Sequence, residues 1–344
     1  MSLRRKFKKA KRALRRPFEW LGICTAMAVL CPLPRRALLE AADAASAVMY
    51  FFDRAGRRRA LANLRIIRGS AAPGSSAPAP DSPASAAETK VIRRSYRNMA
   101  RTVAHAIWTL RDARRRAALA GEMSPEGKAL LAAHRPAVTV SAHLGCWEIL
   151  SQLAFLEGHE MMSVAKDIGS GGMTRLLMRA RRSIGQEIVP AKGAFVPLMK
   201  GLKAGKSLGL LVDQAVSPSD GGIWVRFFGR PVPMSAAPAF FAAKCKAPVF
   251  VAWSRPLKDG RYRCEVIATH KWEEARDVWG FTQKCVGELE GVIRRHPSCW
   301  LLNYNAFRKT PKADDLKKLA EREASAAQSA SQAAAQTRTA GEGR

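Results

Sequence analysis

The alternation of short apolar segments with helix-period segments constrains the fold of this chain most. From residue 138 to residue 295, apolar runs are separated by longer segments whose apolar residues recur every three or four positions. Such alternation is typical of a sheet covered by helices, so we predict an α/β fold with a mixed, largely parallel sheet flanked by helices. Strands are expected in the segment leading to His143 and over 161–165, 187–189, 208–212, 249–253 and 262–267. Helices are expected over 92–107, 173–184, 195–203, 236–244 and 275–295, and from Trp147 onward.

The segment 138–148 places two reactive side chains around a strand end. His143 follows the apolar strand, Gly145 allows a tight turn, and Glu148 falls in the first turn of the next helix. The helix dipole favours an ionised carboxylate there, and we expect its oxygen to reach the imidazole. This gives a base oriented by a carboxylate, as in a triad without its serine, so the reacting hydroxyl would belong to a substrate. The alternative is a half-buried histidine beside a helix-capping glutamate.

Two further motifs follow strands or lie between them. Asp213 ends the apolar segment 208–212, and functional residues of open α/β sheets tend to lie past such strand ends. An ordinary turn residue is the alternative for Asp213. The segment 227–233, Phe-Phe-Gly-Arg-Pro-Val-Pro, taken alone indicates an aromatic core plug with a rigid turn.

The helix expected over 173–184 carries four arginines, Arg175, Arg179, Arg181 and Arg182. Such a run is usually a solvated helix face. On a short helix of a membrane-associated protein it could instead bind phosphates, because the guanidinium group matches phosphate geometry. Both interpretations remain open at this point.

The charge of the chain points to anionic partners. It has 58 basic and 28 acidic residues, which gives a formal net charge of +30. Nucleic acid, acidic lipid and an acidic carrier protein all fit this charge. The cysteines are scattered without CxxC or Cys/His spacing, so a structural zinc site is not expected.

The first 31 residues have the pattern of a membrane anchor. Residues 4–16 contain nine Lys or Arg side chains around a narrow apolar stripe, and 18–31 is apolar with the single charge of Glu19. A helix over 18–31 would be ~21 Å long, which is short of the ~30 Å hydrocarbon core. The segment could span the membrane only if flanking residues extend it, and an interfacial or re-entrant anchor is the alternative. We favour an uncleaved anchor of either kind over a secretory signal peptide, which a basic-then-apolar pattern also resembles.

These patterns divide the chain into four parts. We predict a basic, membrane-anchoring helical region over 1–68 and a disordered Pro/Ser/Ala loop over 69–89. The α/β domain follows over 90–311. The tail over 312–344 is expected to be disordered after one or two helical turns.

The ordered set His143-Leu-Gly-Cys-Trp-Glu148, Asp213-Gln214 and Phe227-Phe228-Gly229-Arg230-Pro231, after a basic apolar N-terminus, resembles the lysophospholipid acyltransferase superfamily. It is most similar to the lipid A biosynthesis branch, the lauroyl/myristoyl transferases, over about residues 10–310. The resemblance implies an acyltransferase-type fold and His143 and Glu148 as the catalytic pair. It also implies these substrate-binding residues: Arg181, Asp213, Phe228, Gly229 and Arg230.

The chain departs from the family pattern at three places, one of which is the Pro/Ser loop at 69–87, which is longer than expected. Cys146 stands where many relatives have Asn, and the C-terminal Trp300…Asn305-Ala306-Phe307-Arg308-Lys309 keeps part of the usual Trp…Arg-Phe-Lys ending. These departures leave the implied chemistry in place and the acceptor open.

The resemblance implies transfer of a fatty acyl chain from an acyl-carrier protein, or acyl-CoA, to a hydroxyl of an anionic membrane lipid, with a lipid A precursor favoured. A phospholipid, an ornithine lipid or another glycolipid is the alternative acceptor. It further implies an inner-membrane protein with its catalytic domain on the cytoplasmic side and with no metal and no cofactor. A basic nucleic-acid-binding protein is the alternative from another class, but no nucleic-acid module is evident and no such partner is expected.

Overall fold

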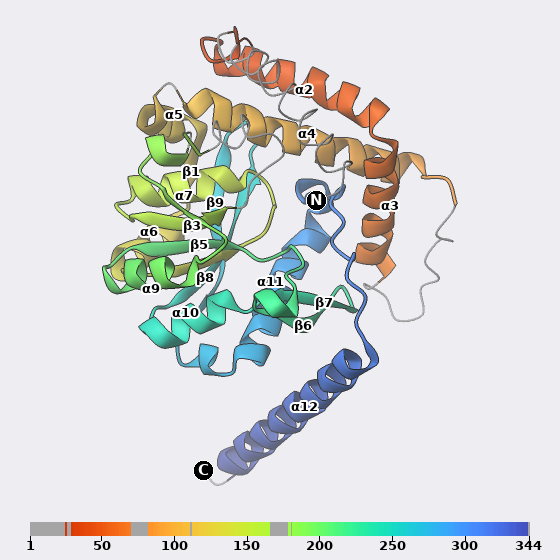
Figure 1. The fold of residues 1–344 in the computed structure, drawn as a ribbon, viewed down its shortest axis with the longest axis vertical. Coiled ribbons are helices and arrows are strands. Elements are labelled where there is room, and N and C mark those ends of the chain that lie inside the picture. The colour runs from red at the N-terminus through yellow and green to blue at the C-terminus, as the bar shows by residue number, and fades with distance from the viewer. Residues whose placement is uncertain are drawn as a thin grey trace, which may run out of the picture.

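A seven-stranded sheet forms the centre of the computed structural model, which describes residue 25 and residues 29–69, 82–110, 112–165, 178–179 and 181–342 (Figure 1). The strands follow the spatial order β1-β9-β8-β2-β5-β3-β4, and every neighbouring pair is parallel except β8 and β9. The predicted α/β fold with a mixed, largely parallel sheet is therefore confirmed. The strands are β1 (Gly121–Met123), β2 (Val138–Ser141), β3 (Met161–Ala165), β4 (Glu187–Pro190), β5 (Ser207–Leu211), β8 (Val249–Pro256) and β9 (Tyr262–His270).

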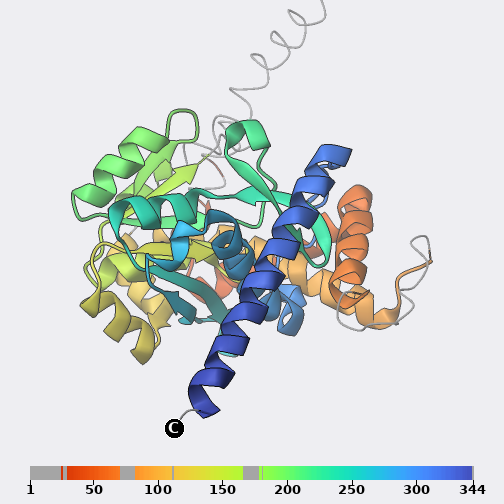
Figure 2. The same ribbon diagram turned by 90° about the horizontal axis from the view of Figure 1, so that it is seen from below.

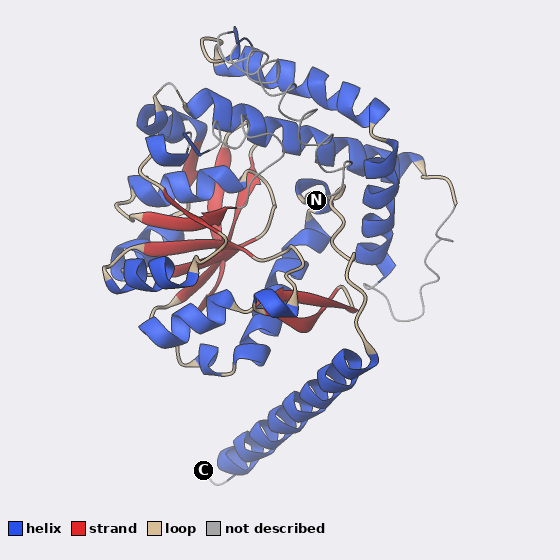
Figure 3. Cartoon of the chain, in the orientation of Figure 1, coloured by secondary structure: helices blue, strands red, loops and turns tan. Residues whose placement is uncertain are grey.

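Helices lie on both faces of this sheet, and a separate hairpin packs beside it (Figure 3). The hairpin consists of β6 (Gly222–Phe227) and β7 (Arg230–Ser235). The helices are α2 (Arg35–Phe52), α3 (Arg54–Gly69), α4 (Ala86–Thr109), α5 (Ala113–Ala120), α6 (Pro125–Ala133), α7 (Trp147–Leu156), α9 (Phe195–Lys203), α10 (Ala237–Cys245), α11 (Val278–Arg295) and α12 (Ala313–Glu342). Of the predicted elements, β3 and α9 begin and end at the expected residues.

The central strand β2 is paired along both of its edges and is buried. It pairs with β5 on one side and β8 on the other, and Val138 and Val140 are fully buried. Successive side chains of a strand point to opposite faces. On β8, Val251 packs in the cluster with α9, α10 and α11, whereas Phe250 packs in the cluster with α7. Two apolar layers thus cover the sheet, and its strand ends remain available for polar residues.

The N-terminal helices α3 and α4 hold a C-terminal segment in place. The side-chain amide of Asn63 donates hydrogen bonds to the carbonyl oxygens of Leu302 and Tyr304, each at 2.7 Å. The Ser95 hydroxyl donates to the carbonyl oxygen of Trp300 at 2.6 Å. These bonds fix a segment that lies more than 200 residues further along the chain. The N-terminal helices α3 and α4 are therefore a structural part of the α/β domain.

The end of the 69–89 loop and the C-terminal tail differ from the sequence expectation. The loop predicted to be disordered over 69–89 falls largely outside the described residues, and its last part belongs to α4, which Ser85 and Glu88 begin with a capping box. Where a tail disordered after one or two helical turns was expected, α12 forms a long helix that projects from the body (Figure 1) and crosses in front of it when seen from below (Figure 2). Its first half is held by Leu319, which is buried, and by the ion pair of Glu323 with Arg226.

The described helices give no membrane span: none combines enough length with enough apolar character to cross a bilayer. The basic arm at 4–16 lies outside the described residues, and so does most of the apolar segment at 18–31. The predicted anchor in these residues stays a prediction.

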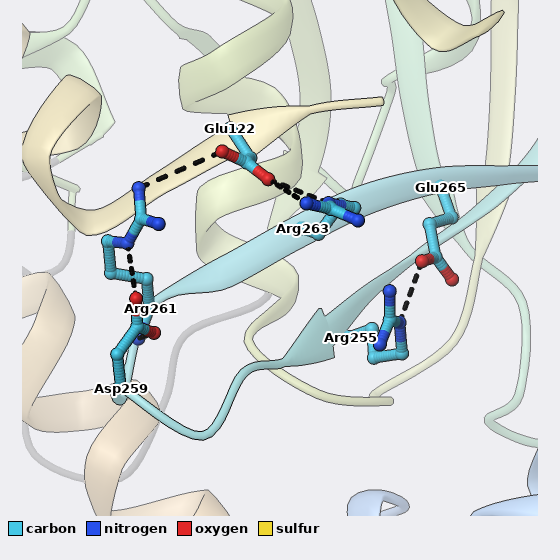
Figure 4. A network of polar contacts seen from close by, with 6 residues as sticks. All are labelled: Glu122, Arg255, Asp259, Arg261, Arg263 and Glu265. Atoms are coloured by element: carbon cyan, nitrogen blue, oxygen red, sulfur yellow. Dashed lines mark hydrogen bonds and ion pairs between the residues drawn. The ribbon is translucent and has the colours of Figure 1, made fainter. Parts of the chain in front are cut away.

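Partly exposed ion pairs link β1, β9 and β8 at the β1 end of the sheet (Figure 4). Glu122 on β1 accepts hydrogen bonds from Arg263 on β9, with Nε at 2.7 Å. Arg255 and Glu265 pair across β8 and β9 at 2.7 Å. Charged side chains at an edge strand disfavour pairing with another chain.

Candidate active site

His143 is held at the end of β2 by backbone hydrogen bonds to a distant segment. Its carbonyl oxygen accepts from the Leu301 N–H at 3.1 Å, and the Gly145 N–H donates to the Cys299 carbonyl at 2.9 Å. Gly145 has a φ of 64°, and a Cβ there would lie 1.8 Å from the carbonyl oxygen of Ser254. Only glycine fits this turn. The turn after β2 is thus held by hydrogen bonds to Cys299 and Leu301 and by its close approach to Ser254.

The carboxylate of Asp213, which follows β5, orients the imidazole. The Oδ1 atom lies 2.8 Å from His143 Nδ1, and Oδ2 accepts the His143 backbone N–H at 3.1 Å. Oδ2 also accepts the indole N–H of Trp300 at 2.8 Å. Burial by itself raises the pKa of Asp213, but the neighbouring imidazole and these donors lower it below its ordinary value. Asp213 therefore stays ionised and holds Nδ1 protonated.

The second imidazole nitrogen, Nε2, is not bound by Asp213. With Nδ1–H donating to Asp213, Nε2 carries a lone pair, and the side-chain NH₂ of Gln214 lies 3.4 Å from it. The Trp147 ring packs edge-on against the imidazole, with ring centroids 4.9 Å apart. His143 is one of the residues that line a cavity. This is the arrangement of a general base whose tautomer is fixed by a buried carboxylate.

Glu148 binds an arginine instead of the imidazole. Its Oε2 accepts from Arg181 Nε at 3.0 Å and its Oε1 from Arg181 Nη2 at 2.6 Å. The Trp147 indole N–H also donates to Oε1, at 3.1 Å. The expectation that Glu148 orients His143 is therefore wrong, because Asp213 occupies that position. The first turn of α7 points the Glu148 carboxylate at the helix that follows β3.

The Glu148–Arg181 pair is nearly sheltered from water. The two side chains are 9% and 13% exposed. Burial raises the pKa of Glu148, yet the Arg181 charge and its hydrogen bonds bring the pKa below its ordinary value. Both groups are charged, and both line the cavity. A bidentate pair leaves further guanidinium N–H groups of Arg181 free of Glu148.

A cavity of about 740 Å³ connects these residues with the apolar interior. His143, Trp147, Arg181 and Gln214 lie on its wall together with apolar residues from both faces of the sheet. A largely apolar cavity with a few convergent polar groups is the usual form of a small-molecule site. This one suits a hydrocarbon chain with a polar end.

The structure separates the predicted residues into two groups. His143, Glu148 and Arg181 line the cavity, and Asp213 lies directly behind His143. Phe228 is buried against Trp300, with ring centroids 6.2 Å apart. Gly229 and Arg230 are exposed at the turn between β6 and β7, and none of these three lines the cavity. Of the other helix arginines, Arg179 and Arg182 are exposed and Arg175 lies outside the described residues.

Sequence reasoning assigned no site role to Trp300, Gln214 and Arg308. Trp300 contacts Asp213 from 87 positions away, and only the fold reveals that contact. Gln214 follows Asp213 directly, so its position beside the predicted strand-end acid was the available signal. Arg308 lines the cavity, and its guanidinium lies 5.8 Å from the ring centroid of Tyr304, which also lines it.

A group that could hold a metal ion lies elsewhere among the described residues. Potential ligand atoms of His270, Cys285 and Glu288 all lie within 4.8 Å of one another. His270 Nε2 bonds to Glu288 at 2.9 Å and Nδ1 lies 3.4 Å from Glu274. This histidine thus already has carboxylate partners on both nitrogens, and the group does not line the cavity.

The fold and the site define an α/β enzyme in which a histidine–aspartate pair faces an apolar cavity. In the described structure the imidazole ring is hydrogen-bonded to the side chains of Asp213 and Gln214. Residues 4–309 match the family model described as bacterial lipid A biosynthesis acyltransferase. The chain belongs to this family and is an acyltransferase, which confirms the resemblance found in the sequence. No curated protein matches the chain significantly.

Proposed function

We propose that the protein transfers a fatty acyl chain from the thioester of an acyl-carrier protein to a hydroxyl of a lipid A precursor. The family implies an acyl donor and a lipid acceptor. An acidic carrier and a phosphorylated glycolipid both complement the net charge of +30. The observation that carries the proposal is that His143 lines the cavity while its Nδ1 is held by the buried carboxylate of Asp213.

In this mechanism His143 moves one proton twice. Nε2 takes the proton of the acceptor hydroxyl as its oxygen attacks the thioester carbonyl carbon. Asp213 stabilises the imidazolium that forms. The C–S bond of the tetrahedral intermediate then breaks, and the leaving thiolate receives the proton from His143. The products are the new ester and the free carrier thiol.

Arg181 is the proposed donor to the oxyanion of the tetrahedral intermediate. It lines the cavity with His143, and Glu148 holds its guanidinium from one side. A fixed, sheltered cation stabilises developing negative charge without reorganisation. In this proposal Glu148 is a positioning residue. Phe228, Gly229 and Arg230 would contact only a part of the acceptor that extends beyond the cavity.

A membrane-surface location is supported by the exposed end of α2. Phe51 and Phe52 are 71% and 75% exposed, and Val48 is 58% exposed. The exposed Arg54 and Arg58 follow on α3. Apolar side chains next to arginines favour a membrane interface with anionic headgroups. We propose that this end of α2, together with the residues before it, binds the cytoplasmic face of the inner membrane.

The test of the catalytic assignment is His143→Ala in purified, folded protein, with product lipids measured by mass spectrometry. We expect a loss of ~10³-fold or more in kcat/KM, because no other described group takes the place of Nε2. The control is His134→Ala, an exposed histidine outside the cavity, which should keep full activity. Near-normal turnover by His143→Ala would contradict the mechanism.

The donor and the acceptor are tested separately. Parallel assays use acyl-carrier and acyl-CoA thioesters against a lipid A precursor and against a phospholipid or ornithine-lipid acceptor. Transfer to the lipid A precursor from the carrier thioester supports the proposal. Transfer to another lipid alone would replace its acceptor.

The test of the membrane surface is Phe51→Ser with Phe52→Ser, measured by sedimentation with anionic vesicles. Each aromatic side chain contributes ~1.5–3 kcal/mol when fully buried, so the affinity should fall roughly tenfold or more. The control is Leu119→Ser with Leu316→Ser, whose exposed apolar side chains lie on α5 and α12. Equal vesicle binding by both double variants would exclude this surface.

A further inference from the structure

The cavity that His143 lines reaches both faces of the central sheet. On β8, Val249 and Val251 belong to the apolar cluster of α9, α10 and α11, while Phe250 and Ala252 belong to the cluster of α7. Members of both clusters line this one cavity. The α7 lobe is the part lined by Leu131, Leu150, Ala154 and Phe250, and the α9–α10 lobe is the part lined by Ala194, Phe195, Leu198 and Phe241.

The two lobes differ in their exposure. Leu131, Leu150, Ala154 and Phe250 of the α7 lobe are all buried, and so are Ala194, Leu198 and Phe241 of the α9–α10 lobe. The α9–α10 lobe includes Phe195, which is 50% exposed, and the adjacent Val196 is 56% exposed. An apolar rim on a cavity marks a contact for an apolar ligand or surface. The α9–α10 lobe therefore has an exposed apolar rim, called the lip below, formed by Phe195 with Val196 next to it. The four named residues of the α7 lobe include no such exposed side chain.

Phe195 of the lip contacts two other aromatic side chains. The ring centroid of Phe195 lies 5.0 Å from that of Phe240 and 5.6 Å from that of Phe241. Two exposed lysines are near it in the sequence, Lys192 on the loop before α9 and Lys200 on α9. An apolar lip with cations next to it matches a lipid that has hydrocarbon chains and an anionic headgroup.

Acyl transfer places two hydrocarbon-bearing substrates at one histidine. The reaction joins the donor's carbonyl carbon to the acceptor's oxygen, so the two hydrocarbon parts must leave His143 in different directions. The α7 lobe, whose four named residues are all buried, suits a donor chain that enters tail first from a soluble carrier. We propose that the α9–α10 lobe binds an acyl chain of the acceptor lipid, with Phe195 and Phe241 as the specificity-determining contacts. This inference rests on the proposed function.

The experiment is Phe195→Ser, because this side chain is half exposed and its loss should leave the fold intact. Acceptors with and without their acyl chains are compared over a series of donor chain lengths. KM for the acylated acceptor should rise roughly tenfold, from the loss of aromatic burial. Kinetics with the deacylated acceptor and the order of donor preference should not change. Leu119→Ser, an equally exposed apolar site on α5, is the matched control and should alter neither.

The complementary variant fills the other lobe. Ala154→Leu adds volume to the α7 lobe, so donor preference should shift to shorter chains while KM for the acceptor is unchanged. The inference is overturned if Phe195→Ser shifts the donor preference, or if it leaves the acylated acceptor's KM unaltered. Wild-type protein that acylates no lipid acceptor would defeat the proposed function itself. Activity that ignores the acceptor's acyl chains would defeat this inference alone.

Discussion

Two sets of ion pairs in this protein have similar distances and opposite surroundings. In the cavity wall, Arg181 and Glu148 approach to 2.6 Å with side chains 13% and 9% exposed. At the sheet edge, Arg263 and Glu122 approach to 2.5 Å with side chains 42% and 36% exposed (Figure 4). Judged by distance alone, the two pairs would be expected to contribute equally to the stability of the protein.

Because the two pairs differ in burial, the removal of one partner has a different effect on stability in each. Removing one partner of a sheltered pair leaves an uncompensated charge away from water, which is strongly destabilising. An exposed pair loses little, because water and salt replace the missing partner. The sheltered pair is also an expensive way to stabilise a fold, since its desolvation offsets much of its attraction. Its position beside His143 in the cavity wall accounts for it better than stability does.

The largest effect on stability is expected for Arg181→Met. It leaves the Glu148 carboxylate buried without its cation, so the free energy of unfolding should fall by ~3–5 kcal/mol. Urea unfolding at pH 7 measures this loss. An effect below ~1 kcal/mol would show that water reaches the pair and that the contrast with the sheet edge is smaller than the structure indicates.

The double variant Glu148→Gln, Arg181→Met separates stability from catalysis. Because it removes both charges, much of the lost stability should return. Activity should remain low, because the proposed oxyanion donor is absent. Full recovery of kcat in the double variant would make the pair structural only.

His105 extends the comparison to a buried group with no ionic partner. Its Nε2 lies 2.8 Å from Gln152 Oε1, and Nδ1 has no hydrogen-bond partner in the described structure. Burial lowers the pKa of His105 to about 4 from the ordinary value of 6.5. The unfolded chain therefore binds this proton more readily, and stability is lost as the pH falls from 6.5 towards 4. The full loss over that interval is about 3 kcal/mol.

This expectation is checked by urea unfolding between pH 7 and pH 5 for the wild type and His105→Gln. The difference between the two curves isolates His105 from the other titrating groups. Wild-type stability should fall more steeply with acidification than that of the variant. Parallel curves would mean that His105 accepts a proton in the folded state as easily as in the unfolded one.

The fold could be predicted from the sequence because its strands are short, apolar and separated by periodic helices. β3 and α9 match their predicted bounds, since turn residues and charged side chains enclose them. The short β1 escaped prediction because three residues carry too little pattern to distinguish a strand from a loop. α12 was missed because its alanine-rich composition was interpreted as disorder, although alanine also has the highest helix propensity.

Strand ends and the family resemblance singled out His143, Glu148 and Asp213, and the structure brings them together but pairs them differently. The partner of His143 was assigned to Glu148, five positions along the chain, while the structure supplies Asp213 from 70 positions away. Side-chain direction decides this, because the first turn of α7 directs Glu148 to Arg181. Spacing along the chain does not contain that direction.

The smallest effect is expected at the sheet edge, for Arg263→Ala. This removes the Arg263–Glu122 pair shown in Figure 4 but leaves Glu122 in contact with water. The free energy of unfolding should fall by only ~0–1 kcal/mol, and less at high salt, because salt screens exposed charges. Urea unfolding at low and at 1 M salt measures both. Activity should not change, because Arg263 does not line the cavity. A salt-independent loss as large as that of Arg181→Met would mean that distance, and not burial, determines the contribution of an ion pair in this protein.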